Sequence, residues 1–165
     1  HFALKSDSLY IASQNGNLHR NFMGYSTNAT KLLVGLGASS ISDTWTAFGQ
    51  NIKSVEPYMK RVNEGHLPIY RGHLLTEEDL LVRQHILNIM CRSYTEWSKE
   101  TAEAEVLNMA MSRLKEMAED QIVDLDDDTI RVHDHGKPFI RNVCMALDAR
   151  MWRKKPETTL FSSTI

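Results

Sequence analysis

The spacing of hydrophobic residues divides the chain into a first part of short, mixed segments and a second part of regular helices. In the second part, apolar positions recur every three or four residues over three stretches, which predicts three amphipathic helices. Thr76-Glu77-Glu78-Asp79, a capping box with Asp in place of Glu, opens the first helix, and the second covers about 102–120. The expected buried faces are Val82, Ile86, Ile89, Met90 and Ser93; Leu107, Ala110, Met111, Leu114, Met117 and Ala118; and Ile140, Val143, Cys144, Leu147 and Met151.

Between the second and third helices the pattern changes to that of a hairpin. The segments 122–125 and 129–132 flank the turn residues Asp126, Asp127 and Asp128. Asp134 is expected to cap the third helix, with Pro138 in or near its first turn. Helix, helix, hairpin, helix is a winged-helix-like order.

The first part of the chain is rich in Gly, Ser, Thr and Asn and predicts less regular structure. We expect a short helix over 6–15, capped by Ser6 or Asp7, and a second that starts at Ser54–Pro57 and ends at Asn63–Gly65. The stretch 31–41 combines an apolar run with two glycines, which excludes a regular exposed helix. Its backbone is expected to pack closely against another segment or a ligand.

The length suits one ordinary domain or the tail of a larger protein, and the composition is that of a chain that can bury a core. The 165 residues are 42% hydrophobic and 24% charged, with a net charge of −2. Residues 1–70 carry a net +2 and residues 71–165 a net −4, so we place a boundary near Pro68–Gly72. The absence of a long basic tract argues against nucleic-acid binding, and no apolar run is long enough for a membrane span. No signal peptide is visible, which favours a cytoplasmic protein.

The two cysteines, Cys91 and Cys144, cannot form a disulfide scaffold or a four-ligand zinc or iron–sulfur site. Both lie on or beside a predicted apolar helix face, where a buried thiol is usually inert packing. Their number favours a reducing compartment. Gly35-Leu36-Gly37 is too short for a dinucleotide fingerprint, because Ser40 takes the position of the third glycine.

Three charged or polar clusters also have structural explanations. The acidic run at 124–128 lacks the ligand spacing of a calcium loop and suits a solvated turn. His133 and His135 could converge on one face of a strand, but a metal site needs further ligands. The basic end at Arg150, Arg153, Lys154 and Lys155 is favourable at a helix C-terminus through the dipole alone.

The segment Asn21-Phe22-Met23-Gly24-Tyr25-Ser26-Thr27 is the most unusual in the chain. As an extended strand it would place Phe22 and Gly24 on one face and Met23 and Tyr25 on the other. Such a strand would be an edge strand with packed aromatic residues. Alternatively, Gly24 would let a planar ligand approach the backbone.

This segment, followed by Leu32-Leu33-Val34-Gly35-Leu36-Gly37-Ala38-Ser39-Ser40-Ile41-Ser42, closely resembles the oxygen-independent coproporphyrinogen III oxidases. Further matches are His1-Phe2-Ala3-Leu4, Tyr70-Arg71-Gly72, Leu75-Thr76 and Arg141-Asn142-Val143-Cys144-Met145, and Phe161-Ser162-Ser163-Thr164-Ile165 is similar to the family's C-terminus. The resemblance covers essentially the whole chain.

The resemblance implies a radical S-adenosylmethionine enzyme of heme biosynthesis, which decarboxylates two propionates of coproporphyrinogen III to give protoporphyrinogen IX. The family holds its [4Fe–4S] cluster on a Cys-x3-Cys-x2-Cys motif that is absent here, so the chain resembles the C-terminal part of the enzyme. By position, Phe22, Met23 and Ile41 match residues that contact S-adenosylmethionine. Many relatives have Gln in place of Met23, and a thioether cannot donate a hydrogen bond.

The implied fold is α+β and helix-rich. Residues 1–68 would be the end of a radical S-adenosylmethionine partial barrel, and residues 71–165 a winged-helix-like domain with a β-hairpin. The chain alone is expected to be inactive, and its partner would be the missing N-terminal barrel. The alternatives are a heme chaperone that binds tetrapyrroles and a winged-helix DNA-binding protein. The heme chaperones usually lack the motif at 22–27. Both this motif and the acidic balance argue against the DNA-binding protein.

Overall fold

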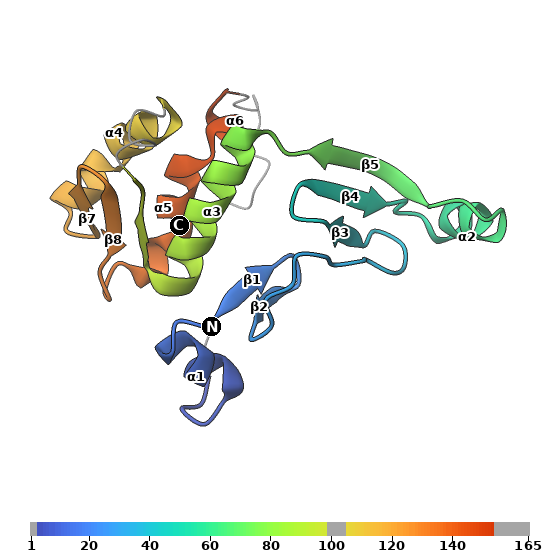
Figure 1. Ribbon diagram of the computed structural model, residues 1–165, viewed down its shortest axis with the longest axis horizontal. Coiled ribbons are helices and arrows are strands. Elements are labelled where there is room, and N and C mark those ends of the chain that lie inside the picture. The colour runs from blue at the N-terminus through green and yellow to red at the C-terminus, as the bar shows by residue number, and fades with distance from the viewer. Residues whose placement is uncertain (1–2, 99–104, 154–165) are drawn as a thin grey trace. The chain divides into compact units, whose positions relative to one another are not determined.

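The computed structural model describes residues 3–98 and 105–153, which fall into two compact units divided between Leu81 and Val82 (Figure 1). The family similarities at His1-Phe2 and at 161–165 lie outside the described residues. So does the start of the second predicted helix. The helix α3 (Glu77–Arg92) runs from one unit into the other. The strand β5 (Ile69–Leu74) pairs with β4. Residues 69–81 therefore belong to the first unit.

The first unit holds two short helices and two small sheets. Its elements are α1 (Ser8–Gln14), β1 (His19–Asn21), β2 (Gly24–Ser26), β3 (Ile41–Asp43), β4 (Ala47–Asn51), α2 (Val55–Asn63) and β5. β1 and β2 form a hairpin, and β3, β4 and β5 form an antiparallel sheet in that order. The strands β3, β4 and β5 were not predicted from the sequence.

Local sequence signals explain both helices of this unit. Asp7 caps α1, since its Oδ1 accepts the backbone N–H of Leu9 at 2.7 Å. Ser54 stands at the N-cap of α2, and Gly65 follows the helix with φ +76°, a conformation that glycine adopts without strain. The predicted bounds of both helices are confirmed to within one or two residues.

The second unit is built from helices packed beside a three-stranded sheet. After α3 come β6 (Tyr94–Glu96), α4 (Glu105–Glu119), β7 (Val123–Asp126), β8 (Thr129–Val132), the 3₁₀ turn η1 (Lys137–Phe139), α5 (Ile140–Leu147) and α6 (Ala149–Arg153). The sheet order is β6-β8-β7, and α4 packs against α5 and β7. The predicted hairpin at 122–132 is confirmed, while β6 was not predicted.

The predicted helical stripes form the core of this unit. Its fully buried side chains include Ile89, Leu107, Leu114, Ile130, Val143 and Leu147. Such burial stabilises each helix far more than its intrinsic propensity does.

The prediction that Asp134 caps the third helix is wrong. A 3₁₀ turn containing Pro138 comes first, and its N-cap is Gly136. The Asp134 carboxylate instead pairs with Lys137 Nζ at 2.7 Å, and this hydrogen bond lowers the pKa of Asp134. Gly136 is required there because a Cβ at this position would lie 2.4 Å from the Ile122 carbonyl oxygen.

Candidate functional site

The unusual segment at 21–27 forms a hairpin rather than one extended strand, with Phe22 and Met23 as its two turn residues. Asn21 pairs with Gly24 across the turn, and Asn21 Oδ1 accepts the backbone N–H of Met23 at 2.8 Å. Gly24 has φ +126°, which side-chain-bearing residues rarely adopt. The expectation of alternating faces through 22–25 is therefore wrong, because the Asn side chain and the Gly conformation turn the chain here.

The two turn residues present apolar side chains outward. Met23 is 87% exposed and Phe22 is 51% exposed. The inner part of the Phe22 ring meets the Phe48 ring edge to face, with centroids 4.9 Å apart. This contact fixes the hairpin turn on strand β4.

The strand register brings Ile41 to the same side of the sheet as the Phe22–Phe48 contact. Residues directly opposite each other in an antiparallel pair point to the same face. Asp43 is opposite Phe48, and Ile41, two residues before Asp43, shares its face. Phe22 and Ile41, which are far apart in sequence, thus lie on one face of β3–β4.

The glycine-rich loop before Ile41 packs on the protein's own backbone, which confirms the expected close approach. A Cβ at Gly35 would lie 2.7 Å from the Ile41 carbonyl oxygen and 2.9 Å from its nitrogen. Glycine at this position therefore allows residues 33–35 to run beside β3, where Leu33 and Asp43 form a bridge.

Side chains from neighbouring elements hold this loop by its backbone groups. The buried Asn51 donates from Nδ2 to the carbonyl oxygens of Gly35 and Gly37, at 3.0 Å each. The Gly37 N–H donates to the Tyr58 hydroxyl at 3.1 Å, and the Gly35 N–H donates to Ser42 Oγ at 3.0 Å. The loop that leads to Ile41 is therefore held by side-chain hydrogen bonds to its backbone.

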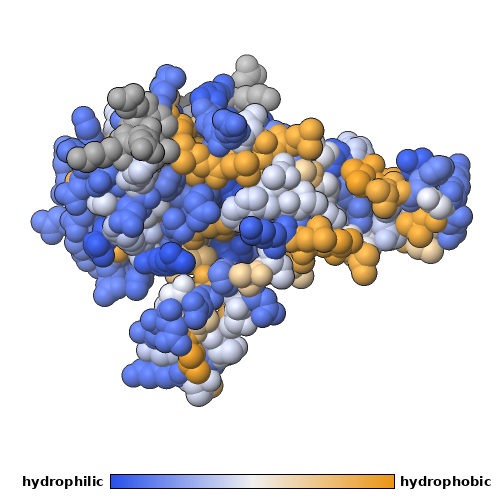
Figure 2. All heavy atoms as spheres, viewed as in Figure 1, coloured by the Kyte–Doolittle hydropathy of each residue, from blue (hydrophilic) through white to orange (hydrophobic). Residues whose placement is uncertain are grey.

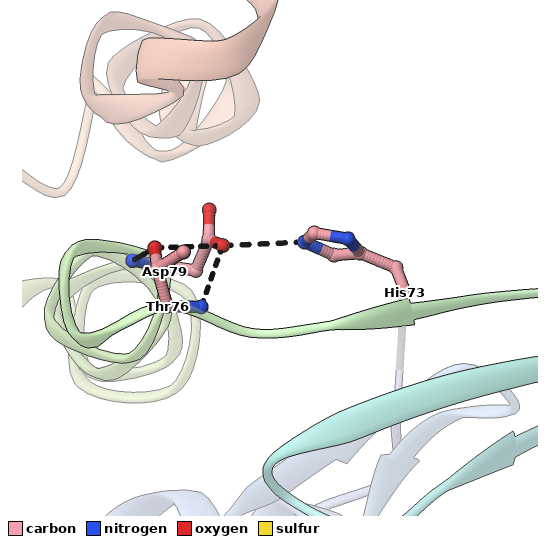
Figure 3. A network of polar contacts seen from close by, with 3 residues as sticks. All are labelled: His73, Thr76 and Asp79. Atoms are coloured by element: carbon pink, nitrogen blue, oxygen red, sulfur yellow. Dashed lines mark hydrogen bonds and ion pairs between the residues drawn. The ribbon is translucent and has the colours of Figure 1, made fainter.

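A second polar network lies where β5 leads into α3 (Figure 3). Asp79 Oδ2 accepts from the backbone N–H and the hydroxyl of Thr76, both at 2.9 Å, and the Asp79 N–H donates to Thr76 Oγ1. The predicted capping box is thus confirmed. His73 Nε2 lies 3.2 Å from the same Asp79 oxygen and joins the end of β5 to the first turn of α3.

The other candidate residues make the following contacts. Cys144 is buried, and its Sγ lies 3.9 Å from the Ile86 carbonyl oxygen as a weak donor. His133 Nε2 pairs with Asp124, and His135 Nε2 with the Gln121 carbonyl oxygen. The two imidazoles stack with centroids 5.3 Å apart, but within 3–98 and 105–153 no three His, Cys, Asp or Glu side chains gather to hold a metal ion.

The described residues therefore do not fit an iron–sulfur cluster, which needs clustered thiolates. They do fit one side of an apolar contact with a small organic cofactor. Phe22 and Met23 are accessible, and no neighbouring atom lies within 4 Å of a Cβ built on Gly24. Phe48 and Asn51, which position this surface, were missed, because the residues on either side of Thr44-Trp45-Thr46 do not alternate between apolar and polar and so give no strand signal.

Comparison with known proteins shows which family the chain is similar to. The chain is 33% identical to the oxygen-independent coproporphyrinogen III oxidase of Escherichia coli K12, in an alignment covering 100% of this chain and 37% of that protein. The chain is a relative of the oxygen-independent coproporphyrinogen III oxidases. The resemblance inferred from its motifs is confirmed, and no protein-family model matches the chain.

One further relative and one solved structure support the same conclusion. The enzyme of Thermostichus vulcanus is 36% identical, with 100% of this chain and 52% of that protein covered. The solved structure of the Escherichia coli coproporphyrinogen III oxidase, reported as a radical SAM enzyme, matches 90% of this chain and 36% of that one with a TM-score of 0.82 and 33% identity. The α+β fold is thus confirmed, and the chain spans about a third to a half of the length of these oxidases.

Among the residues that the structure describes, no helix combines the length and the apolar character needed to cross a membrane.

Proposed function

We propose that this chain is the C-terminal part of an oxygen-independent coproporphyrinogen III oxidase. The complete enzyme would convert two propionates of coproporphyrinogen III to vinyl groups, giving protoporphyrinogen IX in the cytoplasm. The observation that carries the proposal is the match along the whole chain to oxidases at 33–36% identity. In this proposal residues 1–68 are the end of the catalytic barrel and residues 71–165 are the winged-helix-like C-terminal domain.

Within this enzyme, Phe22, Met23 and Ile41 would contact S-adenosylmethionine. The support is geometric: the hairpin turn and the register of β3–β4 bring Phe22 and Ile41 to one face, and Asn51 fixes the loop before Ile41. When bound beside the cluster held elsewhere in the enzyme, the cofactor supplies hydrogen abstraction from the propionate. The residues of this chain orient the cofactor and exclude water from it, and none of them transfers a proton.

The rest of the oxidase would be the partner of the first unit. Large apolar side chains lie exposed on α1, α2, β5 and the loops of this unit: Leu4, Ile11, Leu32, Val34, Leu36, Val55, Met59, Val62, Leu67, Ile69, Tyr70 and Leu74. Figure 2 shows apolar patches over the region of β4, β5 and α2. Exposed apolar area on this scale marks an interaction surface.

The alternative of a heme chaperone is not favoured, because the relatives reported above are named as oxidases. The two proposals predict different outcomes with coproporphyrinogen III. An oxidase decarboxylates coproporphyrinogen III, whereas a chaperone binds heme and leaves the propionates intact.

The test uses the full-length gene product that contains this chain, purified without oxygen. We expect consumption of S-adenosylmethionine and formation of protoporphyrinogen IX, both measured by mass spectrometry. Heme binding with a Soret shift and no decarboxylation would overturn the proposal.

The assignment of Met23 is tested separately in the same protein. M23Q restores an amide that can donate and accept, so we expect a severalfold lower KM for S-adenosylmethionine. M109Q makes the same change at an exposed methionine of α4 and should leave KM unchanged. An active enzyme in which M23Q and M109Q behave alike would overturn the role of Met23 and leave the oxidase proposal standing.

A further inference from the structure

The face of the β3–β4–β5 sheet that carries Ile41 also carries an arginine. Opposite residues of an antiparallel pair share a face, and the register places Gln50 opposite both Ile41 on β3 and Arg71 on β5. These three side chains therefore form one row across the sheet. Because neighbouring strands lie about 5 Å apart, Arg71 stands roughly 10 Å from Ile41 along this row.

The next row of the same face carries the aromatic contact. Phe48 on β4 is opposite His73 on β5, and the Phe22 ring packs on the Phe48 ring. The proposed cofactor contacts Phe22 and Ile41 thus share a continuous face with Arg71, in two adjacent rows.

A chain of hydrogen bonds orients the Arg71 side chain. Arg71 Nε donates to Gln50 Oε1 at 2.9 Å, and Gln50 Nε2 donates to the Ser39 carbonyl oxygen at 3.3 Å. The two bonds define the orientation of the Gln50 amide, because the arginine Nε–H can only donate and the carbonyl oxygen can only accept. Ser39 belongs to the loop before Ile41, so this loop and the arginine are held to the same side chain.

The outer part of the Arg71 guanidinium is open to a ligand. The residue is exposed, and Gln50 takes only the Nε–H. Within residues 3–98 and 105–153 no carboxylate forms an ion pair with it. The two terminal nitrogens therefore offer the planar fork that matches a carboxylate in a bidentate pair.

The other ionisable residues of these two rows, Asp43 and His73, have partners elsewhere. Asp43 is buried, and its Oδ1 accepts the backbone N–H of Trp45 at 2.9 Å. His73 pairs with Asp79 at the start of α3. Arg71 is thus the cation that this face presents to a bound molecule.

We infer that Arg71, oriented by Gln50, binds a carboxylate of a molecule in the active site. The inference rests on the proposed function, in which both reactants carry carboxylates: the propionates of coproporphyrinogen III and the amino-acid group of S-adenosylmethionine. Since Arg71 stands two strands away from Ile41, which would contact the cofactor, we expect the carboxylate to be a propionate.

Steady-state kinetics of the full-length gene product, purified without oxygen, test this inference. R71Q removes the guanidinium and keeps a polar side chain. The KM for coproporphyrinogen III should rise about ten- to a hundredfold, the effect of losing a hydrogen bond between charged groups, while the KM for S-adenosylmethionine stays unchanged. R71K keeps the charge without the fork, so its KM should lie between those of R71Q and the parent enzyme.

R92Q is the matched control, since it makes the same change at an exposed arginine of α3 and should leave both KM values unchanged. A rise confined to the KM for S-adenosylmethionine would retain the site and assign the carboxylate to the cofactor. In an active parent enzyme, unchanged KM values for R71Q would overturn this inference alone. A rise in both KM values with a melting temperature below that of R92Q would indicate a structural role and would also overturn it. A parent enzyme that does not decarboxylate coproporphyrinogen III would overturn the proposed function, and this inference with it.

Discussion

The described residues 82–98 and 105–153 bury apolar side chains from four helices and a sheet, whereas in the described part of residues 1–81 Ala12 alone among apolar side chains is buried. The first unit is instead held by backbone pairing, by the close approach at Gly35 and by side-chain bonds such as those of Asn51. The second unit has the core that an independent domain needs. The first has exposed apolar side chains that, in the function proposed above, the rest of the oxidase would cover.

The largest expected difference comes from truncating one leucine in each unit. Leu114 is fully buried, so L114A should lower the free energy of unfolding by about 2–5 kcal/mol. Leu36 is 83% exposed, so L36A should change it by less than about 0.5 kcal/mol. Urea unfolding followed by tryptophan fluorescence measures both, and equal losses would contradict the contrast.

A smaller effect is expected where the first unit relies on close backbone packing. G35A places a methyl group against the backbone of Ile41, and we expect a loss of about 1–3 kcal/mol. At Gly49 in β4 the nearest atom would be Ile69 Cδ1 at 3.9 Å, so G49A should be neutral or stabilising by up to about 1 kcal/mol. Thermal unfolding of the two variants checks this, and a harmless G35A would show that the loop is not held against β3.

The smallest effect is a pH dependence confined to the second unit. Burial lowers the pKa of His85 in the folded state, so below about pH 6.5 the unfolded chain binds more protons. Stability should therefore fall as the pH drops below about 6.5, until the folded pKa is reached. H85Q should remove this part of the pH dependence of stability. The urea unfolding midpoints of H85Q and the parent chain are compared between pH 7.5 and 5.5. If both midpoints change with pH by the same amount, His85 does not contribute to the pH dependence.

The second unit was the more predictable of the two because its helices repeat apolar residues at a constant interval. Ile89, Leu107, Leu114 and Val143 were all placed correctly on buried faces. The buried His85 was missed, because a titratable residue gives no apolar signal. Asp134 was misplaced because Pro138 starts a 3₁₀ turn, which moves the helix start to Ile140.

The first unit was less predictable because its strands are three to six residues long and one of its pairings, β4 with β5, joins segments about twenty residues apart. The hairpin turn at Phe22 and Met23 depends on an Asn side chain and a glycine conformation, which a period-two pattern cannot express. The family resemblance selected the site residues, and the register of β3 and β4 then brought Phe22 and Ile41 to the same face.

Hydrogen exchange provides the most direct test of the central claim that the first unit is completed by the rest of an oxidase. Amide protection would be compared between this chain alone and the full-length gene product. We expect amides of β3, β4, β5 and α2 to gain protection in the full-length protein, and those of α4, β7, β8 and α5 to exchange equally in both. Equal protection of the first unit in the two proteins would contradict the account.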